Sequence, residues 1–150
     1  MRCARRLTSC AGLCTLVLTE NGSGKMKTRK KQILVVDDEP IWLRSMAAEL
    51  RKVGYQVKEA KSADQALSLL VKYRPDLIVS DLRMPDMNGF DLLDKIRHSP
   101  SISATPVVFF SAIDDFHAKK VARELGATAC LLKPYDKQDL IGLLKQYLPR

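Results

Sequence analysis

The sequence has few cysteines and no long apolar run. Three of its 4 cysteines, Cys3, Cys10 and Cys14, lie near the start, and Cys130 is the only cysteine in residues 32–150, called the body below. One cysteine in the body excludes an internal disulfide framework and suits a reducing compartment, so we predict a cytoplasmic protein. No second C-x-x-C pair or histidine cluster accompanies the early cysteines, so we expect no zinc site. No stretch reaches the roughly 18 apolar residues of a membrane span, so we expect no membrane contact.

The body also lacks an excess of either charge. Residues 1–31 hold eight Lys and Arg against Glu20 alone, which makes +7, and the body holds the other 17 basic and 16 acidic residues, which makes +1. A nearly neutral body offers no general basic surface for nucleic acid, so we expect none to bind there. The basicity of the chain therefore belongs to its first residues.

Residues 1–31 resemble a signal peptide only in outline. A moderately apolar stretch, 7–18, follows two arginines, but no small-residue cleavage site comes after it. We interpret residues 1–31 as a basic extension without a fold of its own. Sequence upstream of a true start at Met26 is the other interpretation.

Two motifs for phosphate chemistry are incomplete. The run 22–25 ends like a P-loop, but Thr19 replaces its first glycine and Met26 replaces the hydroxyl that would meet Mg²⁺. A phosphohydrolase of the D-x-D type would carry a second aspartate two residues after Asp81, where this chain has Arg83. We therefore exclude nucleotide binding by a P-loop and disfavour a dedicated phosphohydrolase.

What the body does contain is a regular alternation of short apolar runs and helical patterns. Helical spacing of apolar residues follows each run, and Pro40 and Gly54 are placed as the start and end of the first predicted helix. Ser62 begins the second, with Gln65 at the spacing of a capping box. Five strands alternating with five helices predict one α/β domain with a central parallel sheet covered on both faces. The predicted strands are 33–36, 55–60, 76–81, 106–111 and 129–132, and the predicted fourth helix is 114–125.

Polar residues of particular types follow four of these strands. They are Asp37 and Asp38 after the first strand, Asp81 after the third, Ser111 after the fourth and Lys133 after the fifth. Ligands of open parallel sheets bind beyond the carboxyl ends of the strands, so we expect these side chains to converge. Converging carboxylates need a neutralising cation, and Mg²⁺ prefers such oxygens and bridges to phosphate. With a hydroxyl and an ammonium added, the set indicates that Asp81 accepts a phosphoryl group.

Four motifs carry a resemblance to a known family. They are Asp37-Asp38-Glu39-Pro40, Asp81-x-x-Met84-Pro85-x-Met87-x-Gly89, Ser111-Ala112 and Lys133-Pro134-Tyr135. In order and spacing they resemble the receiver domains of two-component response regulators, over residues 32–150. The resemblance implies a flavodoxin-like (βα)5 fold with strand order 2-1-3-4-5, of the stand-alone, chemotaxis-regulator-like type.

The resemblance also implies roles for single residues. Asp81 would take the phosphoryl group from a phosphohistidine of a sensor histidine kinase or a histidine phosphotransfer protein. Ser111 and Lys133 would contact the phosphoryl group, and the Lys133–Pro134 bond would be cis. The implied ligands of Mg²⁺ are Asp37, Asp38, Asp81 and the backbone carbonyl of Arg83. The expected output is a change of protein–protein contacts, with limited self-phosphorylation and self-dephosphorylation as the only enzymatic activity.

One position departs from the family's pattern. Receiver domains usually carry Tyr or Phe three residues before the lysine as a rotating switch, and this chain has Cys130 there. We therefore expect a weaker or different route from Asp81 to the output surface, and we interpret Cys130 as a small core residue. Since the sequence ends one helix after Pro134, we expect output through contacts with a protein that the sequence does not identify.

Other interpretations of the same residues stay open at this point. A phosphorylation-independent interaction module with a receiver fold is the alternative function. Asp37 and Asp38 are also suited to cap the helix that follows them. Trp42, on the first turn of that helix, is interpreted as packing or partial cover.

Overall fold

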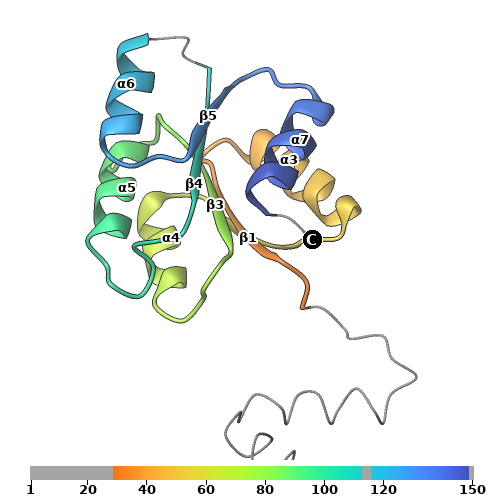
Figure 1. Cartoon of the computed structure of the whole chain (residues 1–150), viewed down its shortest axis with the longest axis horizontal. Coiled ribbons are helices and arrows are strands. Elements are labelled where there is room, and N and C mark those ends of the chain that lie inside the picture. The colour runs from red at the N-terminus through yellow and green to blue at the C-terminus, as the bar shows by residue number, and fades with distance from the viewer. Residues whose placement is uncertain (1–28, 113–115, 149–150) are drawn as a thin grey trace, which may run out of the picture.

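Five parallel strands form the centre of the molecule in the computed structural model, which describes residues 29–112 and 116–148 (Figure 1). The strands are β1 (Gln32–Val36), β2 (Gln56–Ala60), β3 (Leu77–Asp81), β4 (Val107–Ser111) and β5 (Ala129–Leu132). They lie in the order β2-β1-β3-β4-β5, and each pairing is parallel. The predicted fold class and the strand order implied by the resemblance are confirmed.

Helices cover both faces of this sheet. One face carries α4 (Ala63–Leu70), α5 (Gly89–Arg97) and α6 (Phe116–Glu124), and the other carries α3 (Pro40–Val53) and α7 (Lys137–Tyr147) (Figure 1). Along β4, Phe109 belongs to the apolar cluster on the first face and Phe110 to the cluster on the second. Successive side chains of a strand point to opposite faces, so a sheet covered on both sides needs continuous apolar runs.

Local signals in the sequence fix most helix ends. Pro40 occupies the first turn of α3, where its missing N–H costs no helical hydrogen bond, and Gly54 ends α3 in the left-handed region with φ of 110°. At α4, Ser62 Oγ accepts a hydrogen bond from the Gln65 N–H at 3.1 Å, as predicted. The side chain of Gln65 accepts the N–H of Lys61 and not that of Ser62, so the capping box closes one residue earlier than predicted.

Four predicted strand starts are wrong by one residue, and the first of these strands, β1, begins at Gln32, one residue earlier than predicted. Tyr55 donates its N–H to the Leu50 carbonyl, so it belongs to the turn that ends α3, and β2 begins at Gln56. β3 and β4 likewise begin one residue later than predicted, after Asp76 and Pro106. The predicted fourth helix ends at Glu124 instead of residue 125, and the first two residues predicted for it lie outside the described part of the chain.

Most of the predicted extension, residues 1–28, also lies outside the described part of the chain. The Arg29 guanidinium contacts the Asp76 carboxylate at 2.7 Å, and the same carboxylate accepts the Gln32 N–H at 2.7 Å. The last residues of the predicted extension thus contact the body just before β1 begins, and the boundary at residue 32 stays a prediction. Within the described ranges, none of the helices has the length and apolar character needed to cross a membrane.

Candidate functional site

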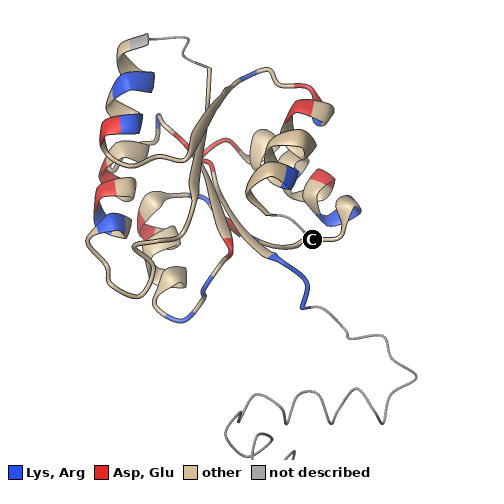
Figure 2. Cartoon of the chain, viewed as in Figure 1, with Lys and Arg blue, Asp and Glu red and all other residues tan. Residues whose placement is uncertain are grey.

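The candidate site lies where β1, β3, β4 and β5 end. Because neighbouring strands run parallel, their carboxyl ends meet at one edge of the sheet, and acidic segments lie together there (Figure 2). A cavity of about 520 Å³ opens at this edge. Its lining residues come from all four strand ends: Asp38, Glu39, Trp42, Asp81, Arg83, Ser111, Ala112, Lys133 and Pro134. The structure therefore brings together the side chains that the sequence predicts to converge.

Three carboxylates form the acidic part of the site. Asp37, Asp38 and Asp81 each offer a carboxylate oxygen, and these oxygens lie within 4.8 Å of one another. Asp37 is 3% exposed and Asp81 is 7% exposed, while Asp38 is half-buried. Buried carboxylates at such separations repel one another unless a positive charge lies among them.

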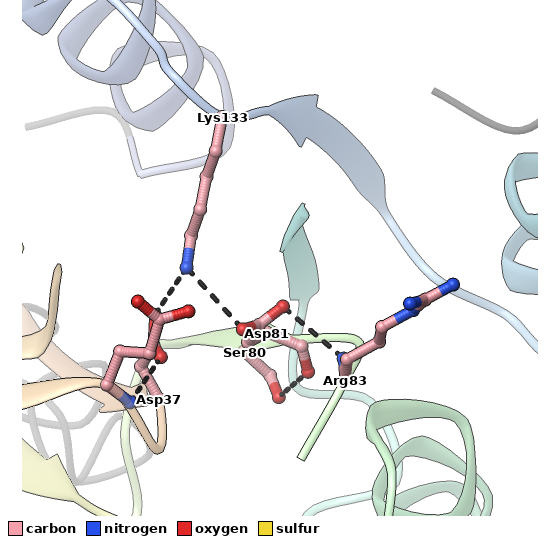
Figure 3. Close-up of polar contacts among 6 residues, drawn as sticks. Asp37, Ser80, Asp81, Arg83 and Lys133 are labelled. Atoms are coloured by element: carbon pink, nitrogen blue, oxygen red, sulfur yellow. Dashed lines mark hydrogen bonds and ion pairs between the residues drawn. The ribbon is translucent and has the colours of Figure 1, made fainter. Parts of the chain in front are cut away.

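Lys133 supplies such a charge. Its Nζ lies 2.6 Å from Asp37 Oδ2 and 3.5 Å from Asp81 Oδ2 (Figure 3). The lysine side chain is 4% exposed. The nearer partner is Asp37, although the family resemblance links Lys133 with the phosphoryl group on Asp81. The Lys133 ammonium thus forms ion pairs with two buried carboxylates, those of Asp37 and Asp81.

The surroundings of Asp81 favour its neutral form. Burial raises the pKa of the Asp81 carboxyl, and the Asp37 carboxylate raises it further. The Lys133 ammonium and the Arg83 N–H, which lies 3.3 Å from Asp81 Oδ1, act in the opposite direction but do not cancel the effect of burial. The ionised form of Asp81 is thus held at a cost in free energy, as is common for reactive carboxylates.

The turn after β1 places the acidic pair. Asp37 Oδ1 accepts the Glu39 N–H at 2.9 Å, and Glu39 itself is the N-cap residue of α3, without a side-chain capping bond. Neither Asp37 nor Asp38 occupies the N-cap position. The interpretation of the two aspartates as a capping pair is therefore wrong, and Asp37 instead shapes the turn that leads into α3.

The turn after β3 depends on Gly89. A Cβ atom at this residue would lie 2.5 Å from the Asp81 backbone oxygen and 2.9 Å from the Phe109 ring. The Gly89 N–H donates to the Leu82 carbonyl at 2.9 Å. The glycine at the end of the Met84-Pro85 motif thus lets α5 start against the carboxyl end of β3, which holds Asp81 in place.

Ser111 and Lys133 are tied to each other through the backbone. The Lys133 N–H donates to the Ser111 carbonyl at 2.7 Å, and Ser111 is 1% exposed. The Lys133–Pro134 peptide bond is cis, as the resemblance implies. These contacts place the lysine beside the ends of β3 and β4.

The contact between Trp42 and Lys133 is not predicted by the sequence. The Lys133 ammonium lies 4.9 Å from the centroid of the Trp42 ring. The one signal in the sequence was an aromatic residue on the first helical turn after the acidic pair, and that signal also fits simple packing. Trp42 therefore belongs to the lining of the site and to the surroundings of its ammonium.

Cys130 does not line this cavity and packs with the apolar cluster on the face of the sheet that α6 covers. It pairs in register with Phe109 and is half-buried against the apolar cluster, so the expected core residue lies at the margin of the core and not inside it. With α6 residues that include Lys119 and Arg123, it lines a separate cavity of about 400 Å³. Burial raises the pKa of the Cys130 thiol, with a smaller opposing effect of Lys119. A space therefore lies beside the residue where the family usually has an aromatic ring.

Comparison with known proteins decides the family. Residues 33–145 match the response regulator receiver domain. The chain belongs to this family. Membership supports a role as a phosphoacceptor signalling switch rather than a dedicated enzyme.

Relatives of this receiver domain include proteins of similar size. An uncharacterized 14.6 kDa protein of Leptolyngbya boryana is 37% identical over 115 residues, which are 77% of this chain and 88% of the relative. PilG of Pseudomonas aeruginosa is 30% identical over 118 residues, 79% of this chain and 87% of PilG. The structure of the chemotaxis protein CheY4 of Vibrio cholerae matches this chain with a TM-score of 0.77 and 29% sequence identity. The match covers 80% of this chain and 100% of CheY4. The chain spans about half of the ycf27 proteins of Porphyridium aerugineum and Cyanophora paradoxa, 50% and 51% of their lengths.

Proposed function

We propose that Asp81 accepts a phosphoryl group from a phosphohistidine, on a sensor histidine kinase or a histidine phosphotransfer protein. The observation that carries the proposal is the position of Asp81 at the end of β3. Its buried carboxylate lies 3.5 Å from the Lys133 ammonium and lines one cavity with Asp38 and Ser111. A lone strand-ending turn residue would need none of these neighbours.

The proposed reaction needs mainly positioning and charge neutralisation. A carboxylate oxygen of Asp81 attacks the phosphorus, an O–P bond forms, and the N–P bond of the phosphohistidine breaks. The electron pair of that bond leaves with the histidine nitrogen, so the products are an aspartyl phosphate and a free histidine. The Lys133 ammonium and the Ser111 hydroxyl are the donors we assign to the phosphoryl oxygens.

The acidic residues fit a magnesium ion. Three carboxylate oxygens within 4.8 Å of one another are hard donors of the type that Mg²⁺ prefers. We propose that Asp37, Asp38, Asp81 and the backbone carbonyl of Arg83 hold the ion, which would neutralise charge on the phosphoryl oxygens when bound. Since Lys133 Nζ lies 2.6 Å from Asp37, the ammonium and the ion compete for one carboxylate.

Phosphorylation of Asp81 would then change contacts with other proteins, with slow self-dephosphorylation returning the switch to its starting state. The alternative is an interaction module that does not need phosphorylation. Cys130 favours it, because this residue cannot act as the rotating aromatic ring of the family. The two functions differ in whether the chain responds to a phosphodonor at all.

Intact mass spectrometry separates them. With Mg²⁺ and a small phosphodonor, we expect the wild type to gain one phosphoryl group and Asp81→Asn to gain none. Asp86→Asn is the matched control, because Asp86 is exposed and has a φ of 68°, a conformation that asparagine tolerates. An adduct that persists in Asp81→Asn would overturn the assignment. Absence of any adduct, with no change of Trp42 fluorescence on adding Mg²⁺ or beryllofluoride, would favour the alternative.

A further inference from the structure

We propose that Trp42 is a positioning residue for Lys133, whose ammonium it keeps beside Asp81 through the face of its indole ring. The proposal rests on the proposed function of the site. It concerns how the lysine remains in place while its carboxylate partners change.

Two carboxylates and one aromatic ring lie close to the Lys133 ammonium. Its Nζ lies 2.6 Å from Asp37, 3.5 Å from Asp81 and 4.9 Å from the centroid of the Trp42 ring. In this arrangement the shortest contact is to Asp37. A shift of the ammonium toward a phosphoryl group on Asp81 would lengthen the Asp37 contact, and a metal ion on Asp37 would repel the ammonium further.

The indole ring suits this change of partner. A cation is attracted to the whole face of an aromatic ring, so the attraction persists while the ammonium shifts across it. Such contacts are strongest where water is excluded, and the Lys133 side chain is 4% exposed. Trp42 is thus a neighbour that Lys133 retains when it moves from Asp37 toward Asp81.

The Trp42 ring is itself held by a stack of aromatic rings. It lies 5.9 Å from the Tyr135 ring, which lies 5.0 Å edge-on from the Phe110 ring. Phe110 is 1% exposed and directly precedes Ser111 in β4. Burial raises the pKa of Tyr135 to about 12, with smaller effects of Asp37 and Glu49, so its ring packs as the neutral phenol. This stack anchors the indole ring to the core beside the site.

Simple packing of Trp42 against the Tyr135 ring predicts a different set of effects. It predicts that losing the ring lowers stability and leaves the lysine where it is. If Trp42 positions Lys133, the lysine should become accessible to a reagent in solution when the ring is removed and Mg²⁺ is bound to Asp37. Trp42→Leu and Trp42→Met replace the indole ring with two different non-aromatic side chains, and Trp42→Phe keeps an aromatic face.

Acetylation of lysine side chains measures the position of Lys133 directly. The protein is treated with a water-soluble acetylating reagent in saturating Mg²⁺, and peptide mass mapping gives the rate of acetylation of Lys133. Lys52, whose side chain is 67% exposed, is the internal reference. Relative to wild type, Trp42→Leu and Trp42→Met should acetylate Lys133 about threefold to tenfold faster and phosphorylate Asp81 slower by a similar factor, from the usual strength of cation–π contacts. Trp42→Phe should stay within about twofold of wild type in both, because it keeps an aromatic face.

Tyr147→Leu is the matched control, because Tyr147 is a half-buried ring on α7 that packs in the same apolar cluster as Phe110 and Tyr135. The proposal is overturned if this control reproduces the effect, if Trp42→Phe behaves like Trp42→Leu, or if no variant changes Lys133 acetylation. The acetylation readout needs no phosphoryl transfer. If wild type accepts no phosphoryl group, the proposed function fails while acetylation still decides the role of Trp42.

Discussion

Replacing Lys133 with methionine should make the stability of the fold depend on divalent cations. The change keeps an unbranched apolar chain of similar length but removes an ammonium 2.6 Å from Asp37 and 3.5 Å from Asp81. Both acids are buried, at 3% and 7% exposed. Removing one partner of a buried ion pair typically costs about 3–5 kcal/mol, because the remaining charge is left unpaired. Asp81 lines a cavity of about 520 Å³, large enough for water, so we expect the lower end of this range, about 3 kcal/mol.

Urea unfolding of the wild type and Lys133→Met measures this cost, first with EDTA and then with excess Mg²⁺. Mg²⁺ stabilises each protein according to its own affinity, so excess Mg²⁺ changes the difference between them only by RT ln of the ratio of their Kd values. In the wild type the Lys133 ammonium, 2.6 Å from Asp37, would compete with the ion, so Lys133→Met should bind Mg²⁺ more tightly. We therefore expect a difference of about 3 kcal/mol in EDTA, and a tenfold lower Kd for Mg²⁺ in Lys133→Met would reduce it to about 1.6 kcal/mol in excess Mg²⁺.

Lys137→Met is the control for this comparison. Lys137 pairs with Glu49 at 2.9 Å, but its side chain is 53% exposed, and exposed pairs contribute only about 0–1 kcal/mol. The reasoning is refuted if Lys133→Met matches the wild type in EDTA, or if Mg²⁺ does not reduce the difference.

Three further substitutions test other parts of the account. Asp81→Asn should raise the free energy of unfolding at pH 7 in EDTA by about 1 kcal/mol, because it removes a buried charge. Since burial raises the pKa of Asp81 above its ordinary value of 3.8, the ionised carboxyl costs stability above the raised pKa. This cost disappears as the pH falls below the ordinary value, so the gain should vanish there in urea titrations. Gly89→Ala should cost about 1–3 kcal/mol through the close approach to Asp81 and slow its phosphorylation, whereas Gly142→Ala, in open space on α7, should stabilise by about 0.5–1 kcal/mol. Cys130→Tyr should fill much of the cavity of about 400 Å³ beside α6 and change the midpoint of thermal unfolding by only a few degrees, and a large loss of stability would show that this space cannot hold the ring.

Much of the fold follows from local patterns in the sequence. The run Ile33–Val36 is apolar throughout because its residues point alternately into the two clusters that cover the sheet. Asp37, Asp81, Ser111 and Lys133 converge because parallel strands end at one edge. These features depend on periodicity and topology, which a sequence carries directly.

The remaining features depend on side chains from distant parts of the chain. The closer approach of Lys133 to Asp37 than to Asp81 depends on how three strand ends are placed relative to one another. The contact of Trp42 with Lys133 joins α3 to the segment after β5, and no periodic pattern connects them. The cavity beside Cys130 depends on the volumes of residues on α6 and β5 together. Such details require the packed structure.

The central claim is that Asp81 receives the phosphoryl group, and locating the modified residue tests it most directly. After exposure to a phosphodonor with Mg²⁺, borohydride reduces an aspartyl phosphate to homoserine, which peptide mass mapping places in the chain. We predict homoserine at position 81 in the wild type and none in Asp81→Asn. Homoserine at Asp37 or Asp38 in the wild type, or equal modification of Asp81→Asn, would contradict it.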